Sequence, residues 1–229
     1  MKARTAAAAV AMFFAAAAAV SAAEKGSDSS YTFAVGPFTP EYAAPAAGSY
    51  ELPAIDTVRD HPLVDASGAK TTLAKILGGR LAVVSFIYGT CSEAEGCPMS
   101  TAVLHRLDQR LAAEPALASR VSLLTISFDP ERDTPERLAA MQAQRADGST
   151  WRFAGGADET SLAELLDDFG QSISKLRRAD GSWTGTYRHV LKVYLLDRRM
   201  QVRNIYSVGF LNPELVENDL KTLAAGDAR

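Results

Sequence analysis

The sequence predicts an α/β domain in which helices flank a central mixed β-sheet. Two continuous apolar runs, residues 81–88 (LAVVSFIY) and 121–128 (VSLLTISF), have the β-branched and aromatic content typical of strands buried on both faces. A segment with helical periodicity follows each run, and strands that alternate with helices usually pair in parallel. Two later apolar runs, residues 189–197 and 201–207, predict a β-hairpin. The sheet is therefore expected to contain both parallel and antiparallel pairs.

Turn and helix signals define the first elements of the domain. Residues 61–80 predict a hairpin with its turn at 65–68 (DASG), followed by a short helical piece that ends at a Gly-Gly pair. Residues 97–115, after the first buried strand, predict a helix. Pro98 suits its first turn, where the missing N–H is not needed. The apolar stripe of this helix consists of Val103, Leu104, Leu107 and Leu111.

The second half of the chain completes the pattern. Thr134 and Pro135 predict the N-cap and the first residue of a helix that follows the second buried strand. A short apolar segment, residues 151–153, precedes two glycines. Residues 212–226 predict a closing helix with Asn212 as its N-cap. A further amphipathic helix is indicated by Leu162, Leu165, Leu166 and Phe169. This order of elements matches the thioredoxin-like architecture, here with an N-terminal extension.

The N-terminus has the layout of a secretory signal peptide. Lys2 and Arg4 are followed by an uncharged, alanine-rich run, residues 5–23, which ends in small residues suited to cleavage. We therefore expect residues 1–23 to be removed and the protein to be periplasmic or otherwise exported. The alternative is an N-terminal membrane anchor that is not cleaved, because the run approaches the roughly 20 apolar residues that a span requires.

The remaining chain divides into an arm, one domain and a short tail. Residues 24–54 are rich in Ala, Pro, Gly and Ser, and are expected to form an extended arm or linker. Residues 55–225 are expected to form a single domain, and residues 226–229 a tail. The net charge is −3 and basic residues do not cluster, so the composition argues against a nucleic-acid partner.

The only two cysteines, Cys91 and Cys97, lie in one loop between the first buried strand and the following helix. A structural disulfide would close a short loop, and short loops remove little chain entropy. The C-terminal end of a strand next to a helix N-terminus favours a thiolate, which suits a thiol–disulfide exchange pair. The third interpretation is a copper site, because Cu(I) prefers thiolate and imidazole ligands.

Three histidines are candidates for the imidazole of such a site. His105 lies on the helix after the cysteines, on the side turned from the expected core, and is expected to be solvated. His61 lies before Pro62 at the domain entrance, where a surface loop is expected. His189 precedes an apolar strand and follows a polar, glycine-containing loop, residues 181–188, that can fold over the thiols. A structural role for His189 stays open at this point.

Several motifs resemble the Sco/SenC family of copper proteins, which serve cytochrome c oxidase assembly. An apolar strand leads into a Cys…Cys-Pro loop, here Cys91 and Cys97-Pro98. Residues 126–138 (ISFDPERDTPERL) are similar to the family's motif at a strand end, and this is the most specific match. Residues 151–155 (WRFAG) are similar to a family tryptophan segment. The likeness covers nearly the whole mature domain.

This resemblance implies a thioredoxin-like fold and a copper site at Cys91, Cys97 and His189, the positions that match the family's ligands. It implies one copper ion per chain, as Cu(I) or Cu(II). The expected partner is an exported or membrane redox protein, such as a copper-containing oxidase subunit. It also implies disulfide reductase activity of Cys91 and Cys97, with a thiol reductant protein as a second partner. The chain is thus expected to be primarily a metallochaperone, and the alternative is a thiol–disulfide oxidoreductase without a metal role.

Two features depart from the family pattern. Five residues separate the cysteines, where the family usually has three, and Arg188 stands beside His189, where the family often has an acidic residue. Met99 is expected to pack in the first turn of its helix rather than act as a fourth ligand. A group of charged residues is expected to cap and pair at a strand–helix junction rather than form a site. This group consists of Asp129, Glu131, Arg132 and Asp133.

Overall fold

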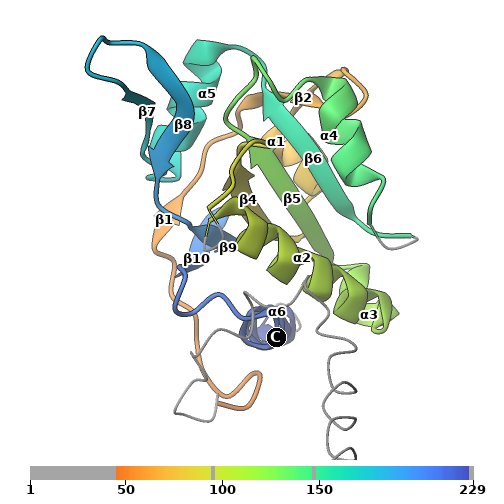
Figure 1. Ribbon diagram of the computed structural model, residues 1–229. Helices are drawn as coiled ribbons and strands as arrows, with labels where there is room; N and C mark the ends of the chain where they lie inside the picture. Colours follow the sequence, from red (N-terminus) through yellow and green to blue (C-terminus); the bar gives the residue numbers. More distant parts are fainter. Residues whose placement is uncertain (1–44, 94–95, 146–147, 227–229) are drawn as a thin grey trace, which may run out of the picture.

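The computed structural model describes residues 45–93, 96–145 and 148–226, and it confirms the expected mixed sheet flanked by helices (Figure 1). The strands of the main sheet are β1 (Asp56–Thr57), β2 (Pro62–Asp65), β3 (Lys70–Thr72), β4 (Leu81–Ile87), β5 (Val121–Ser127), β6 (Trp151–Gly156), β9 (Val193–Leu196) and β10 (Gln201–Tyr206). Their order across the sheet is β1-β10-β9-β4-β5-β6-β2-β3. The pairs β4–β5 and β5–β6 are parallel, and the other pairs are antiparallel.

The two apolar runs of the sequence form the centre of the sheet. Every residue of β4 and of β5 is buried, and their parallel register begins with Leu81 opposite Val121. Beside β5 lies β6, which extends the expected apolar segment 151–153 to six residues. Sequence analysis did not assign this strand, because its last two residues are glycines, which are poor strand formers on their own.

Helices cover both faces of the sheet (Figure 1). They are α1 (Leu73–Leu77), α2 (Cys97–Ala112), α3 (Pro115–Ala118), α4 (Pro135–Gln142), α5 (Glu159–Asp168) and α6 (Pro213–Gly226). On one face α2, α3, α4 and α6 form a core with Leu81 and Val83 of β4. On the other face α1 and α5 form a core with Ala82, Val84 and Phe86. Successive strand residues point to opposite faces, so β4 supplies side chains to both cores.

A two-stranded hairpin projects from the body, at the upper left of Figure 1. It consists of β7 (Ile173–Arg177) and β8 (Trp183–His189), which pair antiparallel. The expectation of a polar loop over residues 181–188 is therefore wrong for most of that segment. Its glycines and small polar residues are not typical of a strand. The segment nevertheless forms one, stabilised by pairing with β7 and by burial of the Tyr187 ring. The hairpin carries His189 as the last residue of β8.

The segments expected as a signal peptide (1–23) and as most of the arm (24–44) lie outside the described residues, as do the last three residues of the expected tail. Among the helices that are described, none has the length and apolar character needed to cross a membrane.

The described part of the expected arm, residues 45–54, lies against α6. The backbone N–H of Gly48 donates to Thr222 Oγ1 at 3.0 Å, and the hydroxyl of Tyr50 donates to the buried carboxylate of Asp219. These contacts hold the described part of the arm against α6.

The contact between α5 and β6 provides a test of the packing. A β-carbon at Gly156 would lie 2.6 Å from Leu162 Cβ, whereas one at Gly155 would come no closer than 3.8 Å to Leu138. We expect Gly156→Ala to lower the free energy of unfolding by about 1–3 kcal/mol, because overpacking displaces neighbouring groups. Gly155→Ala, in the same strand, is the matched control and should change it far less. Urea unfolding of both variants measures this difference, and equal effects would contradict the described packing.

Candidate metal centre

The thiols lie where the central strand β4 ends and α2 begins. Cys91 follows β4 in a loop, and its backbone N–H donates to the carbonyl of Tyr88 at 3.0 Å. Cys97 is the first residue of α2, with Gly96 as the N-cap and Pro98 next in the helix. The partial positive charge of a helix N-terminus stabilises a thiolate placed there. This is the position that the sequence predicted.

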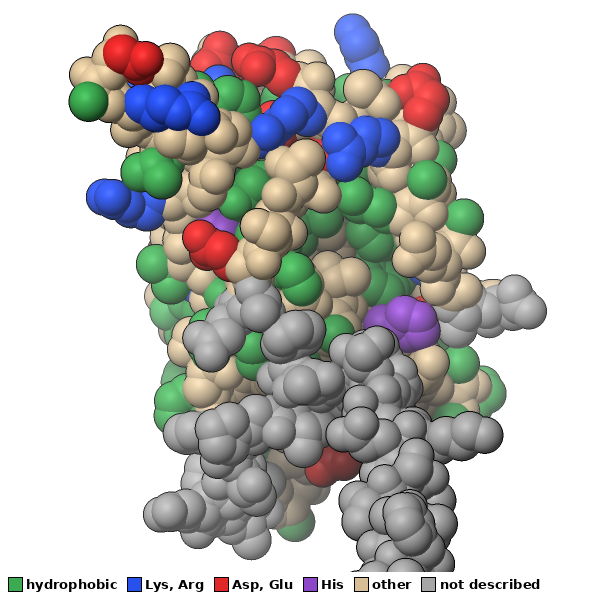
Figure 2. Space-filling view, viewed as in Figure 1, with side chains coloured by type: hydrophobic (Ala, Val, Ile, Leu, Met, Phe, Trp, Pro, Cys, Tyr) green, Lys and Arg blue, Asp and Glu red, His purple; other side chains and the backbone are tan. Residues whose placement is uncertain are grey.

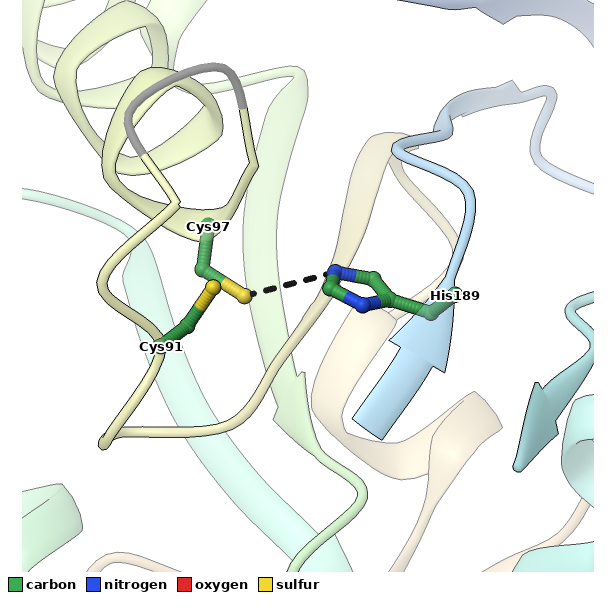
Figure 3. A group of neighbouring side chains, drawn as sticks. All are labelled: Cys91, Cys97 and His189. Carbon is green, nitrogen blue, oxygen red and sulfur yellow. Dashed lines mark hydrogen bonds between the residues drawn. The ribbon is translucent and has the colours of Figure 1, made fainter. Parts of the chain in front are cut away.

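The structure brings His189 to the two thiols. Its Nε2 atom lies 3.7 Å from Cys97 Sγ, and one ligand atom from each of Cys91, Cys97 and His189 lies within 4.8 Å of the others. Figure 3 shows the imidazole pointing from the end of β8 toward both sulfurs. Both cysteines are free thiols. Three separate elements, a loop, a helix and a hairpin, thus contribute one donor each.

Aromatic rings confine the imidazole of His189. Its ring packs edge-on against Tyr88, with centroids 5.5 Å apart, and in a tilted arrangement against Phe128 at 5.4 Å. Tyr187, two residues before His189 on β8, contacts both of these rings at 5.2 Å. All three rings are buried. We call Tyr88, Phe128 and Tyr187 the aromatic wall.

The nitrogens of the imidazole have few protein partners. In the described part of the chain, His189 Nδ1 is buried and has no hydrogen-bond partner. Nε2 faces Cys97 Sγ at a distance that is long for a strong hydrogen bond. Buried polar atoms are normally satisfied, so this ring is suited to a partner from outside the protein.

The two thiols differ in how tightly they bind a proton. A hydrogen bond from the Cys97 thiol lowers the pKa of Cys91 to about 5, with help from backbone N–H groups and from the Tyr88 hydroxyl, while burial acts in the opposite direction. The same interaction with Cys91, together with burial, raises the pKa of Cys97. Cys97 is buried, whereas Cys91 is partly exposed. The metal-free site therefore holds one accessible thiolate beside one buried thiol.

The donor set and its spacing fit a soft metal ion. Sulfur and imidazole ligands lie roughly 2.0–2.3 Å from a first-row ion such as zinc, so two donors of one ion are at most about 4.6 Å apart. The separations of up to 4.8 Å here are close to that limit, so small side-chain movements would close the site. Two thiolates and one imidazole are the ligand types that Cu(I) prefers.

The charged group after β5 has the structural role that the sequence predicted. Asp133 is buried and accepts hydrogen bonds from the backbone N–H of Gly89 at 2.7 Å and from Ser127 Oγ at 2.5 Å. Asp129 is also buried and pairs with Arg132. These contacts tie the end of β5 to the start of the cysteine loop.

The other predicted positions do not join the candidate centre. Met99 packs in the core, as expected. His105 is partly buried on α2. The expectation of a surface loop for His61 is wrong, because this residue is 3 % exposed and its Nε2 lies 2.7 Å from Asp168 Oδ2. That carboxylate also binds Arg59.

Sequence analysis missed the aromatic wall. Tyr88 and Phe128 are the residues directly after β4 and β5, and neighbouring parallel strands end at the same edge of a sheet. The positions of Tyr88 and Phe128 directly after the two apolar runs therefore indicated that their rings lie close together. The contribution of Tyr187 follows only from the folding of β8 against the body.

Comparisons with known proteins agree with the fold. A family model described as SCO1/SenC matches residues 51–225. A SCO1/SenC family lipoprotein from Bacillus anthracis is 27 % identical, with a TM-score of 0.62 over 76 % of this chain and 99 % of that one. ScoI from Bradyrhizobium japonicum, solved with copper bound, is 24 % identical, with a TM-score of 0.59 over 73 % of this chain and 99 % of that one.

A third similar structure is BsSco, described as a member of the Sco family of cytochrome c oxidase assembly proteins with a disulfide switch. It is 21 % identical, with a TM-score of 0.57 over 76 % of this chain and 96 % of that one. A search of proteins with curated descriptions finds no significant match.

Proposed function

The chain belongs to the SCO1/SenC family, and from this premise we propose that it binds one copper ion through Cys91, Cys97 and His189. The observation that carries the proposal is the convergence of two sulfurs and one imidazole nitrogen within 4.8 Å of one another. These donors match the preference of Cu(I) for thiolate and imidazole. The copper-bound state of the similar ScoI from Bradyrhizobium japonicum supports the assignment.

The protein groups are prepared for this role in different ways. Cys91 has a lowered pKa and offers a thiolate without further proton loss near neutral pH. Cys97 holds its proton more tightly, so its coordination releases a proton. His189 is held by the aromatic wall with Nε2 turned to the sulfurs. Bound copper would neutralise the repulsion between two adjacent thiolates.

We propose delivery of copper, reducing equivalents or both to an exported or membrane redox protein, such as a copper-containing subunit of cytochrome c oxidase. The description of BsSco as a cytochrome c oxidase assembly protein supports this class of partner. Partial exposure of Cys91 gives a partner access to one ligand. Residues 1–23 would direct the chain to the periplasm or another exported location, either as a signal peptide that is then cleaved or as a membrane anchor that is retained.

Thiol–disulfide exchange without a metal role is the second candidate, favoured by the accessible Cys91 thiolate beside a buried thiol. The Cys91 thiolate would attack a partner disulfide, forming a mixed disulfide and releasing one partner thiolate. Cys97 would then lose its proton and attack Cys91 Sγ, releasing the second partner thiolate. The partner disulfide gains two electrons, and the Cys91–Cys97 disulfide that forms would be restored by a thiol reductant protein.

Replacement of the imidazole tests the copper proposal. We expect His189→Ala to weaken Cu(I) binding by about tenfold or more, because it leaves only two protein ligands. Titration of the reduced protein against a chromogenic Cu(I) chelator measures the affinity. His105→Ala, a histidine of α2 outside the candidate centre, is the matched control and should bind copper as the wild type does.

Unchanged affinity in the His189→Ala variant would remove His189 from the proposed ligand set. Equal weakening in His105→Ala would place the metal elsewhere on the chain. Reduction of insulin by a protein that retains no copper would favour the second candidate.

A further inference from the structure

We propose that Arg132 is a positioning residue that holds His189 within reach of the thiols, an inference that rests on the proposed function. His189 ends β8, and the β7–β8 hairpin forms a separate two-stranded sheet. Among the described residues this hairpin has no ladder pairing with the main sheet, so side-chain contacts set its orientation. The orientation of the hairpin in turn sets the position of the imidazole.

The guanidinium of Arg132 contacts β8 at two points before His189. Its Nη1 donates to the carbonyl oxygen of Gly185 at 2.9 Å. Its central carbon lies 4.3 Å from the centroid of the Trp183 ring, which is within the range of a cation–π interaction. It also lies 5.9 Å from the Tyr187 ring. The loop after β5 therefore holds β8 through the side chain of Arg132.

Asp129 anchors this side chain to the body. Its carboxylate is fully buried and pairs with Arg132 through Oδ2, and its Oδ1 lies 3.4 Å from the Tyr187 hydroxyl. Tyr187 and His189 are two residues apart on one strand, so their side chains point to the same side. The contacts that fix Tyr187 thus fix the direction of the imidazole.

Two details indicate a specific contact rather than a solvated arginine. Gly185 has φ +88°, a conformation that side chains disfavour, and it is in this conformation that its carbonyl receives Arg132. Arg132 also keeps its place although, within the described residues, its Nη2 is buried without a hydrogen-bond partner. Buried unsatisfied donors are rare, and here the other contacts of the guanidinium maintain it.

Two hydrogen bonds hold the base of the hairpin. Gln171 Nε2 donates to the carbonyl of Val190 at 3.0 Å, and Lys192 Nζ donates to the carbonyl of Gly170 at 2.8 Å. The ring of Tyr187 also packs on Tyr88 and Phe128, and Lys175 of β7 pairs with the exposed Glu131. These contacts do not hold the carbonyl of Gly185 or the ring of Trp183, so we expect removal of Arg132 to loosen the hairpin and to move the imidazole away from the sulfurs. The copper site would then lose its third ligand for part of the time.

The test is a double-mutant cycle on Cu(I) affinity in the full chain. We expect Arg132→Met to weaken binding by about tenfold, the lower end of the effect of residues that orient a metal ligand. In the His189→Ala background, Arg132→Met should cause no further weakening. Arg132→Lys keeps a charge near Asp129 and Trp183, so it should fold and should restore part of the affinity.

Arg145→Met is the matched control. Arg145 also donates to backbone carbonyls, those of Gln142 and Trp151, but it follows α4 and its guanidinium reaches the first residue of β6, at the end of that strand away from the thiols. It should leave copper affinity unchanged. Hydrogen exchange of the metal-free protein should be faster in β7 and β8 of Arg132→Met and unchanged in β4 and β5.

The failures of the two proposals are distinguishable. Copper affinity that falls in His189→Ala but not in Arg132→Met or Arg132→Lys would overturn the role of Arg132 and leave the ligand set intact. An equal effect of Arg132→Met with and without His189 would also overturn it, because Arg132 would then not act through the imidazole. No effect of His189→Ala itself would overturn the proposed ligand set.

Discussion

The combined replacement Cys91→Ser and Cys97→Ser is expected to reduce Cu(I) uptake from about one ion per chain to none, because serine hydroxyls are hard donors that Cu(I) disfavours. Only the imidazole of His189 would remain within the candidate centre. The measurement is the copper content of the reduced protein after loading in the presence of a competing chelator and separation from it. Each single replacement should leave weak binding at most.

Met99→Leu is the control for this experiment. Met99 supplies the nearest additional soft sulfur in the sequence, but it is 5 % exposed and packs in the core. Leucine conserves its volume, and such swaps are well tolerated. This variant should bind as much copper as the wild type. Retention of copper by the double cysteine variant would contradict the proposed site, and loss of copper in Met99→Leu would add a ligand to it.

The fold explains why these donors meet. β4 is buried on both faces and ends at the cysteine loop, so Cys91 and Cys97 are fixed by the most deeply packed part of the domain. His189 arrives on a hairpin that packs on the body through the aromatic wall and Arg132. The sulfurs therefore belong to the body of the domain, and the imidazole belongs to a separate two-stranded sheet packed against it.

The central part of the fold was predictable because its signals are local. The runs that became β4 and β5 are apolar, and their short length and β-branched content favour a buried strand over a buried helix. Pro98 and Pro135 occupy the first turns of α2 and α4, where a missing N–H has no consequence. The position of the thiols follows directly from these elements.

The remaining features depend on contacts between distant segments. β8 contains several small polar residues and is a strand because β7 pairs with it. His61 is buried because Asp168, more than a hundred residues later in the chain, accepts its hydrogen bond. Neither partner can be identified from local periodicity. The convergence of His189 on the thiols was predicted from its place before an apolar strand and from family resemblance, and the hairpin that carries it was not.

In the metal-free protein, Cys91 is expected to react with iodoacetamide at a pH where ordinary thiols are inert. Only the thiolate reacts, so lowering the pKa moves the onset of reaction to lower pH. With a pKa of about 5, Cys91 is almost entirely thiolate near neutral pH, and the rate should fall as the pH drops through about 5. An ordinary thiol, with a pKa of about 8.5, is only about 1 % thiolate at about pH 6.5.

The largest cause of the lowered pKa is the hydrogen bond from Cys97, so Cys97→Ala should move the onset of alkylation by several pH units toward that of an ordinary thiol. Cys97→Ser keeps a hydroxyl donor and should give an intermediate profile. Tyr88→Phe removes a weaker hydrogen bond and should cause a smaller change. Mass spectrometry identifies the modified cysteine, and Cys97 should stay unmodified because it is buried. A wild-type profile with its midpoint near pH 8.5 that Cys97→Ala does not move would mean that no hydrogen bond from Cys97 lowers the pKa of Cys91. Cys91 would then be mostly protonated at neutral pH, and the proposed thiol–disulfide exchange would lack a thiolate nucleophile.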